Sequence, residues 1–139
     1  MPEIPDETSD LLFAALDHGI DSVRGGGPLI PFVIREAGGQ RALARFVHET
    51  LEGGLAEAVA SIKATPIGPG DRCVLAYDGY LTGPDGDRLD AIYAEALDAD
   101  GAITVMAQRY RPGKMLRRFE SLGNAVLLPS DWSKLATEA

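Results

Sequence analysis

The chain has 139 residues, with 45% hydrophobic residues, 24% charged residues and a formal net charge of −8. These are the values of a single globular domain. The sequence has no apolar run of the ~20 residues that a membrane-spanning helix needs. Its acidic net charge argues against binding nucleic acid or anionic lipid. The single cysteine, Cys73, excludes an internal disulfide, and together with an acidic N-terminus that lacks a signal-peptide pattern it favours the cytoplasm of a bacterium.

The first expected element is a helix. Residues 1–8 carry prolines and acids and are expected to form a loose lead-in, with Thr8 or Ser9 as the cap of a helix that begins at about Asp10. Three glycines at 25–27 are expected to end it. Apolar residues recur at steps of three and four, which predicts one buried stripe: Leu12, Leu16, Ile20 and Val23.

A β-hairpin and a second helix are expected next. Residues 29–34 are rich in β-branched and aromatic side chains, Gly38 and Gly39 suit a two-residue turn, and residues 40–47 form the return strand. Pro31 cannot donate to a strand ladder, so we expect it at a sheet edge or a strand end. Residues 48–65 predict a helix with Thr50 as its N-cap. Its expected buried positions are Leu51, Leu55, Val59 and Ile62.

The second half predicts four consecutive strands at 72–81, 88–97, 102–110 and 119–129. Turn residues separate the first three, and residues 130–139 predict a short C-terminal helical turn. In that turn Ser130 would be the cap, and Trp132 and Leu135 would dock against the core. The expected fold is therefore one α+β domain over residues 1–139: helix, hairpin, helix, then a four-stranded antiparallel meander, with the helices packed on one face of the sheet.

Acidic residues in the second half invite a metal-binding interpretation, which the spacing rejects. The segment around Asp98 has the pattern of a calcium loop, but Ala96 and Ala107 stand where the first and last carboxylate ligands are needed. Asp90 and Glu95 are five residues apart, on opposite faces of a regular strand, and no lysine completes a nuclease motif. We expect turns, and no metal ion.

The sequence contains no recognisable catalytic motif. His18 and His48 lie in no zinc-binding pattern, Cys73 lies in an apolar strand, and no serine stands in a nucleophile elbow. The glycine-rich segment at 24–29 follows a helix, so its amides do not converge on a helix N-terminus where phosphate binds. We therefore assign no catalytic residue and expect no cofactor.

One stretch of the chain is strongly basic. Residues 109–119 hold five of the thirteen lysines and arginines and no acid, so the rest of the chain has a net charge of −13 (−8 minus 5). Guanidinium groups bind phosphate or carboxylate, and a tyrosine between them can stack on a ring. The candidate anion-binding residues are Arg109, Tyr110, Arg111, Lys114, Arg117 and Arg118. Alternatively, the arginines only pair with acids of neighbouring turns, such as Asp78, Asp85 or Asp87.

Three functions remain open. The first is a non-catalytic interaction module that meets a protein partner, or a second copy as a homodimer, through a sheet face or edge, because strand 88–97 is apolar on both faces. The second is a binding protein or enzyme for a small anionic ligand, with residues 109–118 as the clamp and Tyr77, Tyr80 or Asp78 as the candidate groups for chemistry. The third is an acidic, immunity-type or antitoxin-like partner of a basic protein.

Overall fold

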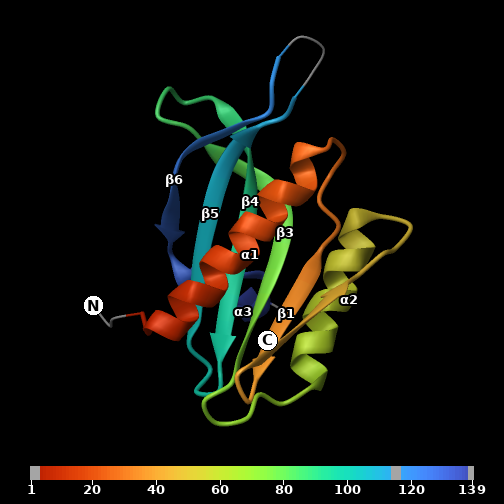
Figure 1. Ribbon diagram of the computed structural model, residues 1–139, viewed down its shortest axis with the longest axis vertical. Coiled ribbons are helices and arrows are strands. Elements are labelled where there is room, and N and C mark those ends of the chain that lie inside the picture. The colour runs from red at the N-terminus through yellow and green to blue at the C-terminus, as the bar shows by residue number, and fades with distance from the viewer. Residues whose placement is uncertain (1–3, 114–116, 138–139) are drawn as a thin grey trace.

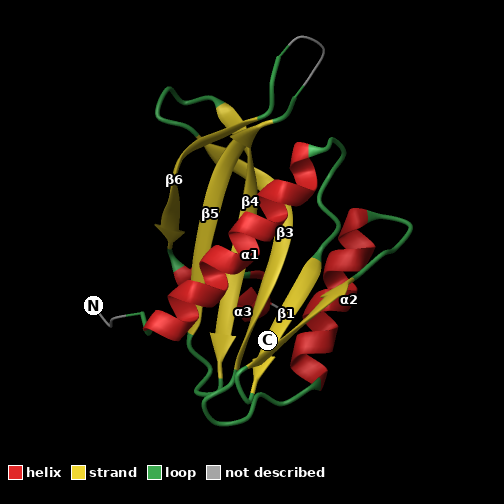
Figure 2. Ribbon diagram, viewed as in Figure 1, coloured by secondary structure: helices red, strands yellow, loops and turns green. Residues whose placement is uncertain are grey.

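The computed structural model describes residues 4–113 and 117–137. These residues form one antiparallel sheet of six strands in the order β2-β1-β3-β4-β5-β6, with helices on both sides (Figures 1 and 2). The elements are α1 (Asp6–Arg24), β1 (Phe32–Ala37), β2 (Gln40–Arg45), α2 (Leu51–Ala64), β3 (Arg72–Thr82), β4 (Arg88–Asp98), β5 (Ile103–Arg111), β6 (Glu120–Leu128), a 3₁₀ turn η1 (Ser130–Trp132) and α3 (Lys134–Thr137).

The α+β class with an antiparallel sheet is confirmed, but the sheet has six strands and not the four of the predicted meander. The first hairpin belongs to the same sheet, because β1 pairs with β3 in antiparallel register, with Ile34 opposite Val74. Strand β1 is therefore internal, and β2 and β6 are the two edges. Nothing in the local pattern of the hairpin specifies which later strand it pairs with, so the sequence left its position open.

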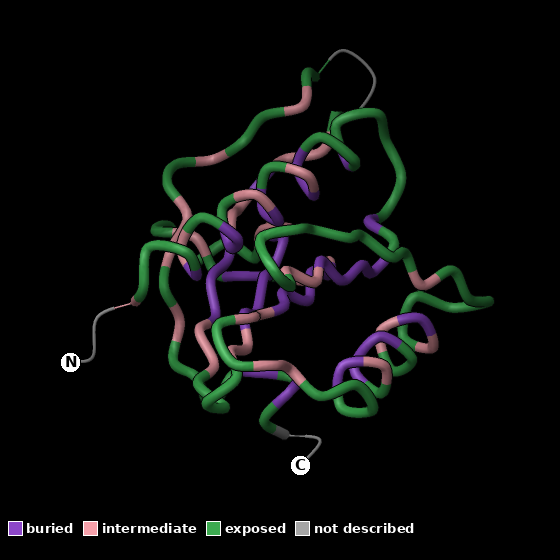
Figure 3. The backbone as a smooth tube through the Cα atoms, turned by 60° about the horizontal axis from the view of Figure 1, so that its bottom comes forward, coloured by how far each residue is buried: buried purple, intermediate pink, exposed green. Residues whose placement is uncertain are grey.

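The expectation that the helices share one face of the sheet is wrong. Alternate residues of β3 point to opposite faces: Val74 packs in the cluster that contains the buried stripe of α1, and Leu75 packs in the cluster that contains α2 and α3. Helix α1 crosses in front of the sheet (Figure 1), and Gly19 permits its close approach, since a Cβ there would lie 2.8 Å from Cγ2 of Ile92. Figure 3 shows the buried backbone in the interior between the helices.

Helix α1 begins at Asp6, four residues earlier than expected. Pro5 precedes the first turn, where its fixed φ is compatible with a helix start, and two acids in that turn favour the N-terminal end of the helix dipole. Thr8, expected to be a cap, is a buried residue inside the helix. No helix in residues 4–113 or 117–137 combines the length and apolar character needed to cross a membrane.

The second helix is largely as expected. The Thr50 hydroxyl accepts a hydrogen bond from the backbone N–H of Gly53 at 2.9 Å, which confirms it as the N-cap of α2. Val59 and Ile62 are buried as expected and Leu55 is partly buried against the same cluster, but Leu51 is 42% exposed. Of the four expected buried positions, the first is therefore exposed.

The hairpin turn is confirmed, since Gly38 and Gly39 have φ angles of 59° and 78°. Strand β1 begins at Phe32, immediately after Pro31, so the proline lies at a strand end as expected. All six residues of β2 are exposed. Its side chains still have neighbours in the chain, since Arg41 contacts Glu36 and Arg45 contacts His18.

A fully buried carboxylate attaches the C-terminal turn to the sheet. Glu95 on β4 accepts hydrogen bonds from the Tyr77 hydroxyl, the Ser133 hydroxyl, and the backbone N–H groups of Lys134 and Leu135. Leu135 is buried beside it as expected. The cap of α3 is Ser133, whose hydroxyl accepts from the N–H of Ala136; the expected cap, Ser130, lies one turn earlier, and Trp132 is half exposed.

Candidate functional site

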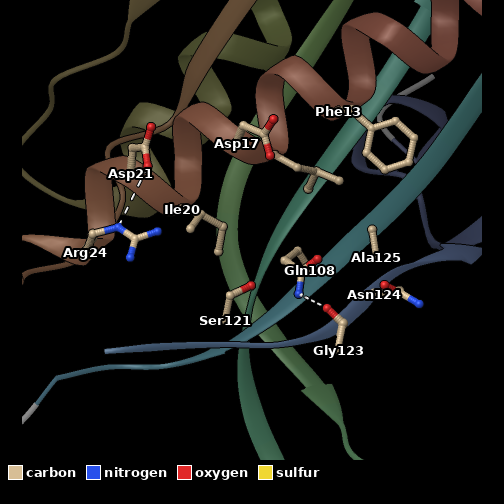
Figure 4. A pocket seen from close by; sticks show the side chains of 11 residues that line it. Phe13, Asp17, Ile20, Asp21, Arg24, Gln108, Ser121, Gly123, Asn124 and Ala125 are labelled. Atoms are coloured by element: carbon tan, nitrogen blue, oxygen red, sulfur yellow. Dashed lines mark hydrogen bonds and ion pairs between the residues drawn. The ribbon is translucent and has the colours of Figure 1, made fainter. Parts of the chain in front are cut away.

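A groove of about 600 Å³ lies between α1 and β6 (Figure 4). It exists because α1 packs mainly on β3, β4 and β5 and covers the same face of β6 only in part. One side of α1 forms its first wall, at steps of three and four residues along the helix: Phe13, Asp17, Asp21 and Arg24. Strand β6 forms the opposite wall with Ser121, Gly123, Asn124 and Ala125.

Gln108 holds the floor of the groove in place. Its side-chain nitrogen lies 3.0, 3.2 and 3.1 Å from the carbonyl oxygens of Arg109, Leu122 and Gly123. These contacts occur where the register between β5 and β6 shifts, between Ala107 and Arg109. The amide donor satisfies carbonyl groups that the irregular ladder leaves without regular partners, so the floor is fixed by the fold and does not depend on a ligand.

The groove is acidic at its rim and partly apolar inside. The charged residues that line it are Asp17, Asp21 and Arg24, a formal charge of −1 (−2 plus 1), on a helix whose five acids and one arginine give −4 (−5 plus 1). Its arginine, Arg24, is already engaged: Nε lies 3.8 Å from Oδ1 of Asp21, and the guanidinium lies 5.1 Å from the centre of the Phe119 ring. Phe13 on α1 is 48% exposed and Leu127 on β6 is 50% exposed. The surface therefore combines negative charge with uncovered apolar area.

The two edge strands differ in charge. Strand β2 contains two arginines and no acid. Its residues Arg41, Leu43 and Arg45 lie on the α1 face of the sheet, because Leu43 pairs with Ile34 and Arg45 pairs with Phe32, both of which pack in the α1 core. Strand β6 lies at the other edge, beside the acidic groove. Each edge presents unpaired backbone N–H and C=O groups that another strand can pair with.

A second hollow, of about 360 Å³, contains two carboxylates from neighbouring strands. The Tyr110 hydroxyl lies 2.9 and 3.0 Å from the two carboxylate oxygens of Asp78, and the N–H of Leu29 donates to Oδ2 at 3.3 Å. Asp90 lies on the same face, opposite both Tyr80 and Tyr110 in the register. Burial raises the pKa of Asp78, and the Tyr110 hydrogen bond partly offsets that rise.

The basic residues predicted from the sequence do not gather around this hollow. Arg109 points to the opposite face from Tyr110, and its Nε and Nη2 donate to the carbonyl oxygen of Thr82 at 3.2 and 2.9 Å. Tyr110 is buried, and its pKa is raised by burial and by the neighbouring Asp78 carboxylate. Two candidates that are adjacent in sequence therefore belong to different surfaces.

The remaining candidates also have separate surroundings. Arg111 pairs with Glu120 across the β5–β6 ladder, with 3.3 Å between Nη1 and Oε2. Nη2 of Arg117 donates to the carbonyl oxygen of a proline five residues earlier, at 3.4 Å, and Arg118 is exposed. Lys114 lies outside the described residues. The ion pair observed is with a carboxylate of the next strand, and not with Asp78, Asp85 or Asp87.

Sequence reasoning did not select the residues that line the groove. Phe13 and Asp17 follow the buried Leu12 and Leu16 by one position each, so they flank the core-facing stripe of the helix. A large apolar residue at such a flanking position is a weak signal, since single exposed apolar residues are common. The groove becomes visible only when β6 is placed beside α1.

The single cysteine is not activated as a nucleophile. Cys73 is fully buried, and burial raises its pKa to about 11, so its thiolate is scarce at neutral pH. The His18 ring packs edge-on against Phe32, and its Nε2 lies 3.3 Å from Nη2 of Arg45. Within the part of the chain that the structure describes, no group of three or more His, Cys, Asp or Glu is placed to hold a metal ion.

Comparison with known proteins gave no assignment: no protein-family model matches this chain, and no curated protein or solved structure is detectably similar to it.

Proposed function

We propose that this chain is a non-catalytic protein-interaction module that binds an extended polypeptide segment in the groove between α1 and β6. The observation that carries the proposal is the position of the groove, which combines an acidic rim, exposed apolar side chains and an open strand edge. An extended segment can add to an open edge through its backbone, while its alternate side chains fill the adjoining groove.

The chemistry of the groove favours a basic and apolar segment. Asp17 and Asp21 stand on the rim, and the one arginine of α1 already contacts Asp21 and an aromatic ring. Phe13 offers apolar contact in the groove, and Leu127 is exposed further along β6. A segment in which lysine or arginine alternates with apolar residues matches both properties on one face. The same argument supports a basic protein as the partner.

The residues along the groove favour binding over catalysis. Its lining includes no histidine, cysteine or lysine among the described residues. Asp17 and Asp21 are exposed on a helix. General acid–base and nucleophilic catalysis need a base held within hydrogen-bond reach of a reacting group, and the groove does not present such a pair.

Binding of a labelled synthetic peptide tests the proposal. A peptide of alternating arginine and valine, followed by fluorescence anisotropy, is expected to bind the wild-type chain, and its glutamate–valine counterpart is not. Asp17→Lys places a positive charge on the rim and should weaken binding about five- to ten-fold, about 1–1.4 kcal/mol. Asp85→Lys, the same change in the β3–β4 turn, is the matched control. Equal affinity of both variants for the peptide would contradict the proposal.

A further inference from the structure

We infer that the segment that binds in the groove is strand β2 of a second copy of this chain, so that copies associate head to tail into a continuous sheet. The inference rests on the proposed function and names its partner. It follows from the directions of the edge strands, the faces on which their side chains lie, and their opposite charges.

The order and directions of the strands are compatible with this addition. Every neighbouring pair in the sheet is antiparallel, and six strands alternate in direction, so the two edges β2 and β6 run in opposite directions. A second copy displaced along the sheet, and rotated about that direction so that the twist of the sheet continues, therefore brings its β2 antiparallel to β6 of the first. The new pair has the same type of ladder as the rest of the sheet.

The same displacement keeps the faces of the sheet aligned. Arg41, Leu43 and Arg45 lie on the α1 face of their own copy. In the neighbouring copy they remain on the α1 face, next to β6, where the groove lies open. Leu43 would then lie toward the uncovered apolar area around Phe13, with the two arginines on either side of it. The two acids of the groove rim, Asp17 and Asp21, would then face a strand that carries two arginines and no acid.

The groups needed on β2 are exposed. All six residues of the strand are exposed, Leu43 is 39% exposed, and Val47 just beyond it is 72% exposed. Arg41 contacts Glu36 at 2.9 Å but its side chain remains 43% exposed. Arg45 has a contact at 3.3 Å with His18 at the surface. A strand whose residues all remain exposed in their own copy gains from being covered by a neighbour.

Charge also selects the head-to-tail arrangement over a two-fold one. Pairing β6 with β6 of a second copy would bring two acidic grooves together, and pairing β2 with β2 would bring the arginines together; like charges directly opposite one another across strands are destabilising. A head-to-tail contact leaves one free β2 and one free β6 at the ends of each assembly. Such contacts continue into open chains or close into rings.

Sedimentation velocity over a concentration series tests the inference. The wild-type chain should show a weight-average sedimentation coefficient that rises with concentration and does not level off at a dimer. Arg45→Glu and Asp17→Lys should each weaken association about ten-fold, and the two changes in one chain should restore much of it, because the charges are exchanged. Arg88→Glu and Asp85→Lys make the same charge changes around the β3–β4 turn, away from both edges, and should leave association unchanged.

Each outcome decides the inference. The inference is overturned if the wild-type chain stays monomeric, or if Arg45→Glu leaves association unchanged. It is also overturned if the double variant does not recover association although both single variants keep the wild-type urea midpoint. If Arg45→Glu shifts that midpoint, Arg45→Gln replaces it in the same series. A monomeric chain that still binds the arginine–valine peptide retains the proposed function and loses only this inference. Loss of both peptide binding and self-association removes both.

Discussion

Two tyrosine–carboxylate pairs lie on opposite faces of this sheet and have different surroundings. Tyr77 donates to Glu95, which is fully buried and accepts three further hydrogen bonds from the C-terminal turn. Tyr110 donates to Asp78, which is only partly buried and lies in a hollow beside a second carboxylate, Asp90.

The number of donors around each carboxylate separates the two roles. Four donors occupy the lone pairs of Glu95, so it accommodates no additional ligand and instead attaches α3 to the sheet. Asp78 receives hydrogen bonds from Tyr110 and Leu29, while burial raises its pKa and Asp90 adds to the rise. A tyrosine–carboxylate pair on a strand is therefore a structural attachment where donors surround it, and an open polar site where they do not.

Removing the Glu95 carboxylate should have the largest effect. Glu95→Ala leaves two hydroxyls and two backbone N–H groups without their acceptor and opens a cavity, and we expect a loss of roughly 3–5 kcal/mol in the free energy of unfolding. Urea denaturation followed by circular dichroism measures it. The unfolding midpoint should fall, with near-ultraviolet signals from Tyr77 and the docked C-terminal turn altered in the native state.

Two further variants serve as comparisons for the loss of stability in Glu95→Ala. Glu95→Gln keeps the size and one acceptor oxygen, so it should lose less than the alanine variant. Glu57→Ala, on the exposed side of α2, should change stability by less than about 0.5 kcal/mol. If Glu95→Ala cost less than about 1 kcal/mol, the attachment of α3 would not depend on this carboxylate.

The pair of Tyr110 and Asp78 should instead affect how the free energy of unfolding depends on pH. Because burial raises the pKa of Asp78, the folded state binds more protons than the unfolded state between the unfolded pKa of about 3.9 and the raised value. Within that window the contribution of Asp78 to stability falls as pH rises. Asp78→Asn removes this term, so its free energy of unfolding should decline less from pH 4 to pH 7 than that of the wild type.

Urea titrations at several pH values make this measurement, with Asp85→Asn as the control in an exposed turn. The control should keep the wild-type pH dependence. Parallel curves for Asp78→Asn and the wild type would mean that the hollow is too well hydrated to perturb the carboxyl. Tyr110→Phe should steepen the wild-type decline, because the Tyr110 hydrogen bond lowers the pKa of Asp78.

Local signals in the sequence were sufficient for the elements and for several turns. The Thr50 cap, the Gly38–Gly39 turn and the buried pattern of β4 are all confirmed, because each depends on residues close in the chain. The faces of the sheet that α1 and α2 cover were not predictable in this way. Strands buried on both faces have apolar residues at every position, so their pattern does not tell which helix covers which face.

The sites were less predictable than the fold. The cluster of arginines was conspicuous in the sequence, yet Arg109 and Tyr110 lie on opposite faces and Arg111 pairs with Glu120. The groove is assembled from α1 and β6, which are about a hundred residues apart and carry no shared motif. Its recognition required the sheet order, which depends on long-range pairing.

The smallest effect is expected for Arg111→Ala. Its ion pair with Glu120 is 41% and 57% exposed, so water and salt compete for both charges, and the loss in stability should be below about 1 kcal/mol and smaller still at high salt. This contrasts with Glu95, whose donors have no water to replace the lost acceptor.

The Arg111→Ala variant, combined with Arg109→Ala, tests the anion-binding hypothesis in a thermal melt with phosphate. A phosphate-dependent rise in Tm that the double variant abolishes would make the basic stretch a site, whereas equal shifts in both proteins would leave Arg111 as a solvated partner of Glu120.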